Sequence, residues 1–436
     1  YLIINKPSAQ SLQLSATPAT DINIYGGLGG YTFQLQNGNL DLNGRVCNFA
    51  MSSNGNNNNI ALDGSAGNLV RNINSSLAGG VFKIYNIDNV ARFSMIRPLG
   101  ANAATLSIND NVTITIGGVS QNSGVDFGNN LTTINNIFQI NTWGYVEANP
   151  PNYGSNSTLI YNSGGSYKRY LEWSTLSGPG YPNNVIVQNN TALRINDDNL
   201  PVNNNGNGTA DRAMAGTFTI SAGSAAVMGD STENNRLTIG KDFILNGTIT
   251  MPSTTRAIGA DLYIAGNWNR SSTGVFNHNE RAVFFNGSTR STITASGGQY
   301  FPYLYLQKNA TTDSLKLLDN ITIGKIFTIN SGTFDLAAKD AILRSRDTTA
   351  QFGPIGTTGS VSYSGVGRFV VERYASARRA WRLLSSPTRH DIQTIKQAWQ
   401  ENAIVPNSNP VAGFGTQITS NRTTWQADGF DTLSIA

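Results

Sequence analysis

Short strand-like segments recur along this chain, and two of them are near copies. The segment from Leu237 to Ile249 aligns with the segment from Ile321 to Phe334, with one inserted residue before the second glycine. Each segment alternates apolar and polar residues and is interrupted by Asn and Gly, a pattern typical of short strands separated by turns. Strand starts recur 17 to 25 residues apart at Leu237, Leu262, Ala282, Leu304, Ile321 and Ala341. A repeat of this length indicates a stack of similar layers.

A single short strand cannot bury its apolar face, so successive layers must stack and share one core. We therefore predict an all-β fold in which residues 1–360 form a right-handed parallel β-helix or β-solenoid. Its coils are expected to contain about 20–25 residues, with an insertion near residues 150–185. The right hand is the one favoured by parallel crossovers. A series of antiparallel β-sandwiches is the alternative, because Asn-Gly hairpin turns give a similar alternation.

The composition fits layers with many tight corners. Only 13% of the residues are charged, against about 25% in typical soluble proteins, while Gly occurs 45 times and Asn is abundant. Gly adopts positive φ without steric cost, and Asn tolerates it, so both suit corners. Asn side chains can also form hydrogen-bonded ladders between neighbouring layers.

Charge, cysteine content and hydropathy exclude several classes of protein. A net charge of +4 on 436 residues is too dilute for nucleic-acid binding. The single cysteine, Cys47, excludes an intramolecular disulfide framework and is expected to be a buried packing residue. No apolar run reaches the length of a membrane span, so direct membrane insertion is not expected.

The composition changes near the C-terminus. Asn is absent from residue 331 to residue 400, and arginines accumulate there. We predict that residues 361–436 begin a second, Arg-rich and β-rich module that is truncated. The segment from Asp391 to Asn402 places Ile392, Ile395 and Trp399 on one face, which predicts one short helix in this module.

Three groups of residues are weighed as sites. Asp197, Asp198 and Asp211 lie in an Asn-rich segment that could bind calcium, although a solvated loop is the favoured interpretation. A second group of aromatic residues could stack on sugar rings, but packing of an insertion on the solenoid is favoured. This second group comprises Tyr167, Tyr170, Trp173 and Tyr181. His278 stands beside Glu280 but near no recognisable Ser or Cys nucleophile, so a catalytic base is disfavoured.

Several blocks of the chain resemble a known group of proteins. The block from Tyr153 to Gly165, followed by Leu171-Glu172-Trp173-Ser174, resembles a block of large secreted cell-surface proteins of Bacteroidota. The repeat from Phe327 to Leu336 is similar to their repeats. The tail block from Val371 to Pro387 is similar to a segment that follows their repeat region.

The resemblance implies a multi-module, adhesin-like extracellular protein exported by the type IX secretion system. It implies other modules of the same polypeptide, other surface proteins and the export machinery as partners, and we expect this chain to be a fragment. Exported proteins of this phylum carry O-glycans on Asp-Ser/Thr motifs followed by an aliphatic residue or Thr. The matching positions here are Ser231, Ser314, Thr348 and Thr432.

We therefore expect a non-enzymatic structural or adhesive protein of the cell surface, without catalytic residues or a resident cofactor other than the calcium considered above. One alternative is a β-helix protein that binds glycans or degrades polysaccharides, since such folds host both activities. A hydrolase would need two carboxylates held across a groove, and the acidic residues here are scattered. The other alternative is a subunit that assembles into a fibre or sheath.

Overall fold

A computed structural model describes most of the first 373 residues. The described residues are 2–7, 10–15, 17, 21–25, 31–51, 58–63, 70–90, 92–99, 104–119, 123–174, 176–195, 211–229, 235–253, 259–345 and 350–373. The chain divides into two compact units. The first comprises Tyr1–Arg344 with Thr348–Val370, and the second comprises Ser345–Asp347 with Val371–Ala436. The second unit lies almost wholly outside the described residues, as does the helix predicted from Asp391 to Asn402.

Two six-stranded sheets belong to the N-terminal part of the first unit. Sheet A contains β1 (Leu2–Asn5), β4 (Tyr31–Asn37), β7 (Asn58–Leu62), β10 (Arg92–Pro98), β13 (Ser123–Asp126) and β16 (Gly144–Val146). Sheet B contains β2 (Ser11–Gln13), β5 (Asn39–Asp41), β8 (Val70–Asn74), β11 (Thr105–Ile108), β14 (Thr132–Ile134) and β17 (Asn152–Tyr153).

A third sheet, sheet C, continues through both halves of the unit. It contains β3 (Ile22–Tyr25), β6 (Val46–Met51), β9 (Gly80–Asn86), β12 (Val112–Gly118), β15 (Ile137–Asn141), β18 (Thr158–Asn162), β20 (Asn184–Val187), β23 (Phe218–Ile220), β26 (Phe243–Leu245), β29 (Trp268–Arg270), β32 (Ser291–Ala295) and β34 (Ser314–Leu317). Each of these strands pairs with the strand of the preceding layer.

Two further strand groups belong to the C-terminal layers. Sheet D contains β19 (Ser166–Lys168), β21 (Ala192–Arg194), β24 (Ala225–Val227), β27 (Thr248–Thr250) and β30 (Val275–Asn277). Sheet E contains β22 (Arg212–Met214), β25 (Leu237–Ile239), β28 (Leu262–Ile264) and β31 (Ala282–Phe285). The remaining strands are β33 (Gln299–Gln307), β35 (Ile321–Asp335), β36 (Ala341–Leu343), β37 (Gln351–Phe352), β38 (Thr358–Ser362) and β39 (Phe369–Val371).

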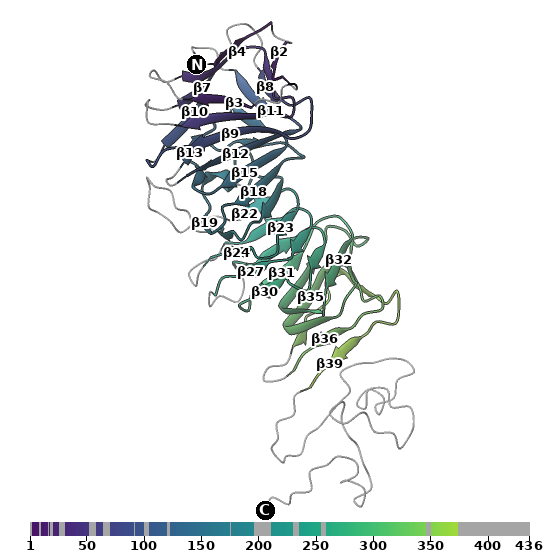
Figure 1. Ribbon diagram of the computed structural model, residues 1–436. Helices are drawn as coiled ribbons and strands as arrows, with labels where there is room; N and C mark the ends of the chain where they lie inside the picture. The colour runs from purple at the N-terminus through teal and green to yellow at the C-terminus, as the bar shows by residue number, and fades with distance from the viewer. Residues whose placement is uncertain are drawn as a thin grey trace, which may run out of the picture. The chain divides into compact units, whose positions relative to one another are not determined.

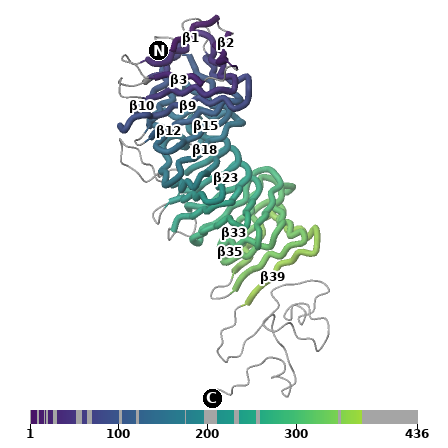
Figure 2. The backbone as a smooth tube through the Cα atoms, in the orientation of Figure 1, coloured from purple at the N-terminus to yellow at the C-terminus, as the bar shows by residue number. Residues whose placement is uncertain are grey.

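Every strand pairing whose register the structure describes is parallel. The colour bands of Figures 1 and 2 succeed one another in chain order, so each layer of the first unit packs on the preceding one. The predicted all-β class with parallel sheets is confirmed for these residues, consistent with a β-solenoid. The alternative of antiparallel sandwiches is wrong for them.

The number of residues per layer changes along the chain. In sheet C, Phe218, Phe243, Trp268 and Ile293 are successive partners and lie 25 residues apart. Near the N-terminus, Cys47 pairs with Phe82, 35 residues further along. The N-terminal layers are therefore longer than the predicted 20–25 residues, because their connecting segments are longer.

The arrangement of the sheets changes in the segment where an insertion is predicted. Sheet B ends with β17, and sheet D begins with β19. Between β16 and β22 lies η1 (Leu171–Trp173), a 3-10 turn and the helical element of the described residues. The indole Nε1 of Trp173 donates to the carbonyl oxygen of Ala213 at 2.7 Å, which joins η1 to the next layer. Among the described residues, no helix has the length and apolar character to cross a membrane.

The core is a column of apolar side chains shared by all layers. In most three-residue strands the first and third side chains are buried and the second faces outward, as in β25 and β26. Phe218, Phe243 and Trp268 stack in one ladder, with ring centroids 5.8 and 5.2 Å apart. Each layer thus covers the apolar side chains of its neighbour, which a single layer could not do.

Asparagine has the two roles predicted for it. In sheet B and its corner, Asn72 donates to Asn39 at 2.9 Å, Asn109 to Asn72 at 3.1 Å, and Asn135 to Asn109 at 3.2 Å. These four residues form an asparagine ladder through four layers. Asn also supplies six of the ten non-glycine residues described with positive φ. The prediction of corner asparagines and side-chain ladders is confirmed.

Candidate functional site

An open groove lies where the backbone ladder of sheet D ends. The strands up to β30 pair in sequence, but the next strand at this position, the first part of β33, pairs with β35 instead. The groove has a volume of about 600 Å³. The β30 layer contributes Arg270, Gly274, Val275, Phe276 and His278 to its lining. The layers that follow contribute Gly298, Gln299, Tyr300 and Arg344.

The Arg270 guanidinium bridges the two sides of this interruption. Its Nε donates to Oε1 of Gln299 at 2.9 Å, and its Nη1 donates to the carbonyl oxygen of Gly274 at 3.0 Å. Its Nη2 donates to the carbonyl oxygens of Ser296 and Gly298, at 2.8 and 2.6 Å. Arg270 therefore supplies the hydrogen bonds that a strand pair would otherwise make. Its donors are directed at protein acceptors, while its positive charge remains beside the groove.

His278 begins a tight turn at one edge of the groove. Asn279 and Glu280 have φ values of 43° and 60°, and the Arg281 amide donates to the His278 carbonyl oxygen at 2.8 Å. These values are typical of a type I′ turn. The Glu280 amide donates to Nδ1 of His278 at 3.1 Å. In the neutral imidazole the hydrogen therefore lies on Nε2.

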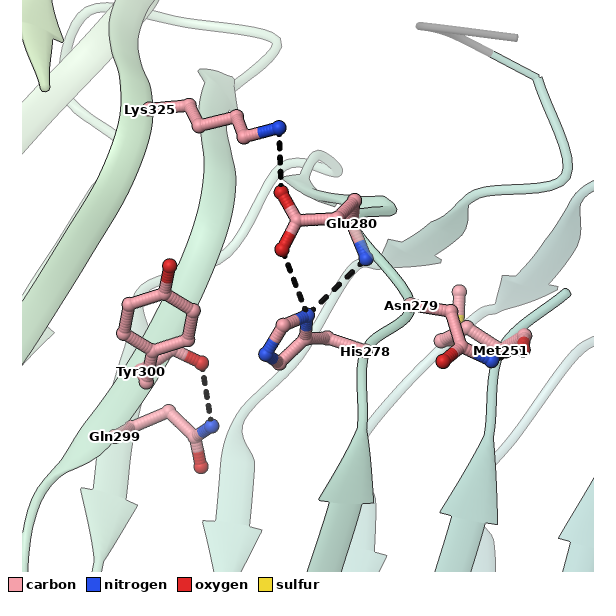
Figure 3. A network of polar contacts seen from close by, with 7 residues as sticks. All are labelled: Met251, His278, Asn279, Glu280, Gln299, Tyr300 and Lys325. Carbon is pink, nitrogen blue, oxygen red and sulfur yellow. Dashed lines mark hydrogen bonds and ion pairs between the residues drawn. The ribbon is translucent and has the colours of Figure 1, made fainter. Parts of the chain in front are cut away.

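Glu280 is held away from the groove by a cation. Its carboxylate lies 2.6 Å from Nζ of Lys325 and 3.8 Å from Nδ1 of His278. Figure 3 shows this chain of contacts, with Nε2 of His278 directed towards the side where Tyr300 and Gln299 lie. Burial lowers the pKa of His278, and Lys325 lowers it further, while Glu280 opposes the shift. His278 is therefore a neutral hydrogen-bond donor at neutral pH.

Tyr300 forms the opposite wall. Its ring centroid lies 4.9 Å from that of His278, and the Arg344 guanidinium carbon lies 5.7 Å from the Tyr300 centroid. A side chain at Gly324 would meet the Tyr300 ring and hydroxyl, so this glycine makes room for the ring. Arg344 follows β36 and extends back across the layer of β35 to reach Tyr300.

The groove is positively charged and partly aromatic. Arg270 and Arg344 are among its described lining residues, and none of those residues is Asp or Glu. Phe276, His278 and Tyr300 supply ring surfaces, and Gly274 and Gly298 leave space between them. Such a lining can attract an anion and pack against the apolar face of a planar or cyclic group.

The aromatic group predicted from sequence lies elsewhere, in the segment where the sheets change. Trp173 is fully buried and Tyr167 is 7% exposed, whereas Tyr170 and Tyr181 are half-buried. Tyr167 and Tyr170 pack with their centroids 5.9 Å apart. The Gly180 amide donates to the carbonyl oxygen of Pro151 at 2.9 Å, so the neighbouring turn rests on the preceding layer. These contacts agree with the packing interpretation.

A buried ion pair underlies this aromatic group. Arg169 and Glu172 are 1% and 0% exposed. The Nε of Arg169 donates to the carbonyl oxygen of Ile195, and Oε1 of Glu172 accepts the Tyr170 amide at 3.0 Å. Burial lowers the pKa of Arg169 to about 10 and raises that of Glu172. The pair positions η1 inside the protein and offers no exposed carboxylate.

The other predicted sites are only partly within the described residues. Asp211 accepts the Arg236 amide at 3.0 Å and pairs with the Arg236 guanidinium at 2.8 Å. Asp197 and Asp198 lie outside the described residues. Within the described part of the chain, no group of three or more His, Cys, Asp or Glu residues could hold a metal ion.

Of the predicted O-glycan acceptors, Ser314 is described, in β34, and is half-buried beside Asp313. Ser231, Thr348 and Thr432 lie outside the described residues. Ser314 pairs with Thr333 of β35 in a parallel ladder. A glycan on Ser314 would therefore stand on a paired strand rather than on a loop.

Comparison with protein-family models, curated proteins and solved structures found no match.

Sequence reasoning singled out only His278 among the residues that line the groove. Arg270, Gln299, Tyr300 and Arg344 are separated by up to 74 residues and meet only because the layers stack. The one sequence signal nearby is Gly324, which aligns with Gly240 in the internal repeat.

Proposed function

We propose that this chain is a right-handed parallel β-solenoid of an extracellular surface protein that acts by binding, without catalysis. The observation that carries the proposal is the continuity of the parallel ladders, which build a fixed surface from layer to layer. The right hand is supported by the general preference of parallel crossovers. Export by the type IX secretion system and attachment to further surface modules are supported by the sequence resemblance.

The stacked layers suit adhesion for a physical reason. Each layer is tied to its neighbours by backbone ladders, by the asparagine ladder and by caps such as Arg270. Side chains on successive layers therefore keep fixed positions, and little ordering entropy is lost when they contact a partner. Many weak contacts can then add along the surface.

The groove favours glycan binding as the form that this adhesion takes. It is open, combines ring surfaces with arginines, and lies on the outside of the layered core. Glycan degradation and assembly into a fibre or sheath are the competing functions.

Adhesion and product release should be measured together. Inert beads carrying the full chain are applied to surfaces coated with acidic or neutral polysaccharides, and new reducing ends are assayed in the supernatant. We expect bead retention without new reducing ends, and no retention of beads carrying heat-unfolded protein. Sustained release of reducing ends, abolished by Asp197→Asn with Asp198→Asn, would instead establish an enzyme. Absence of retention on every surface would also overturn the proposal.

A further inference from the structure

The groove beside β30 has an electrostatic character that differs from the rest of this charge-poor chain. Two guanidinium groups line it, and no described carboxylate does so. Glu280 is the nearest acid described at its edge, and this carboxylate is occupied by Lys325 at 2.6 Å. An incoming anion would therefore meet positive charge without competing with a lining acid.

The two arginines have different tasks. Arg270 directs hydrogen bonds at Gln299 and at carbonyl oxygens on both sides of the interruption, so its role is to hold the groove open. Arg344 is held over Tyr300 by a ring contact, 5.7 Å from the guanidinium carbon to the centroid. Its planar fork matches a carboxylate, which can accept two parallel hydrogen bonds from it.

The rest of the lining favours a cyclic, hydroxyl-bearing partner. His278 directs its Nε2 towards the groove, and a neutral Nε2–H donates to a hydroxyl or ether oxygen. The rings of His278 and Tyr300 give a partly apolar wall, and Gly274 and Gly298 keep the space beside it clear. The volume of about 600 Å³ is within the range of small-ligand sites.

We propose that this groove binds a carboxylate-bearing saccharide, with Arg344 on the carboxylate and the wall of Tyr300 and His278 against the sugar ring. This proposal rests on the adhesive function proposed above and names its ligand class. An acidic peptide has the same charge but lacks a saturated ring with an apolar face to lie against Tyr300. The observations therefore favour the saccharide.

The test is calorimetric titration of the full chain with a galacturonate trisaccharide at low salt. Matched probes are the methyl-esterified trisaccharide, which has the same rings without the charge, and a triglutamate peptide, which has the charge without the rings. We expect the acidic trisaccharide to bind at least about tenfold more tightly than either probe. Equal affinity for the esterified sugar, or tighter binding of the peptide, would overturn the proposal.

Variants locate the site. Arg344→Gln is expected to reduce affinity for the acidic trisaccharide about tenfold or more, and Tyr300→Ala to reduce affinity for both sugars. Gly324→Val displaces the Tyr300 ring and should act like Tyr300→Ala. Arg290→Gln removes an exposed arginine outside the groove and serves as the control. Unchanged unfolding midpoints separate loss of the site from loss of the fold.

The outcome distinguishes this proposal from the general one. If the trisaccharide does not bind while protein-coated beads still adhere, the ligand assignment is wrong and the adhesive function stands. If Arg290→Gln weakens binding as much as Arg344→Gln, the interaction is diffuse charge attraction and the groove is not the site.

Discussion

The ammonium group of Lys308 donates a hydrogen bond to Oγ of Ser291 at 2.6 Å, from a side chain that is only 2% exposed. The same Nζ donates to the carbonyl oxygens of Asn286 and Ala265, at 2.7 and 3.2 Å. These acceptors belong to the two preceding layers, so one lysine ties three layers together. Burial of the charge lowers the pKa of Lys308 to about 8.

The buried lysine predicts a pH dependence of stability. Between the folded pKa of about 8 and the unfolded value of 10.5, the unfolded chain binds a proton that the folded chain does not. The unfolding free energy of the wild type should therefore rise relative to Lys308→Met, by about 2 kcal/mol from pH 8 to pH 10. Denaturant titrations at both pH values measure this difference. A difference that does not change with pH would contradict the buried position of the ammonium group.

Cys47 should be chemically silent in the folded protein. It is fully buried in β6, and burial raises the pKa of its thiol to about 12. Because the thiolate is the reactive form, we expect a thiol reagent to modify native protein at pH 8 at least about 100-fold more slowly than protein in guanidinium chloride. The unfolded sample should release one equivalent of reagent per chain, and similar rates in the two samples would show that Cys47 is accessible.

The asparagine ladder should stabilise the N-terminal layers. The Asn109 side chain donates to Asn72 and accepts from Asn135, at 3.1 and 3.2 Å. Asn109→Ala is expected to lower the unfolding free energy by about 1–2 kcal/mol. Asn109→Asp should cost more at pH 7, because a carboxylate cannot donate to Asn72. Asn309→Ala, at an exposed position with no described side-chain hydrogen bond, is the control and should change stability by less than about 0.5 kcal/mol.

Removal of the Arg270 cap should destabilise the layers around the groove. Arg270→Gln leaves the carbonyl oxygens of Gly274 and Gly298 without their donor, which we expect to cost about 2–4 kcal/mol of unfolding free energy. Arg270→Lys keeps the charge but loses the planar fork, so it should restore only part of that loss. Thermal unfolding of both variants measures the effect. Full stability of Arg270→Lys would show that charge alone is sufficient.

Local alternation in the sequence was enough to predict the strands and the class of fold. Leu237 and Leu262 were predicted as strand starts, and they pair directly in β25 and β28. The corner role of asparagine also followed from the residues, because positive φ selects Gly and Asn. The short helix predicted from Asp391 to Asn402 stays a prediction, since it lies outside the described residues.

The internal repeat does not mark equivalent positions in the layers. The sequence alignment sets Phe327 against Phe243, but the ladder that starts at Leu237 leads through Leu304 to Phe327. The first copy is broken into three strands, whereas the second is the single 15-residue strand β35. The copies share strand and turn chemistry, while the number of residues between corners determines which sheet each strand joins.

The groove could not be predicted because its residues are distant in sequence. Arg270 and Gln299 are 29 residues apart, and Tyr300 and Arg344 are 44 apart. Their proximity depends on the register between layers, which no local pattern specifies. The aromatic segment at Tyr167 and Trp173 was conspicuous in the sequence, yet its large rings are largely used for packing.

The groove, the asparagine ladder and the Arg270 cap all require that successive layers pair in parallel and in this register. Paired cysteines test that requirement most directly. Ile244 and Asn269 are partners in adjacent layers, whereas Thr294 lies one layer further on. Under mild oxidation, Ile244→Cys with Asn269→Cys should form a disulfide, because neighbouring strands lie about 4.8 Å apart. Ile244→Cys with Thr294→Cys, about 9.6 Å apart, should not. Cross-linking of the second pair but not the first would contradict the stacked parallel layers.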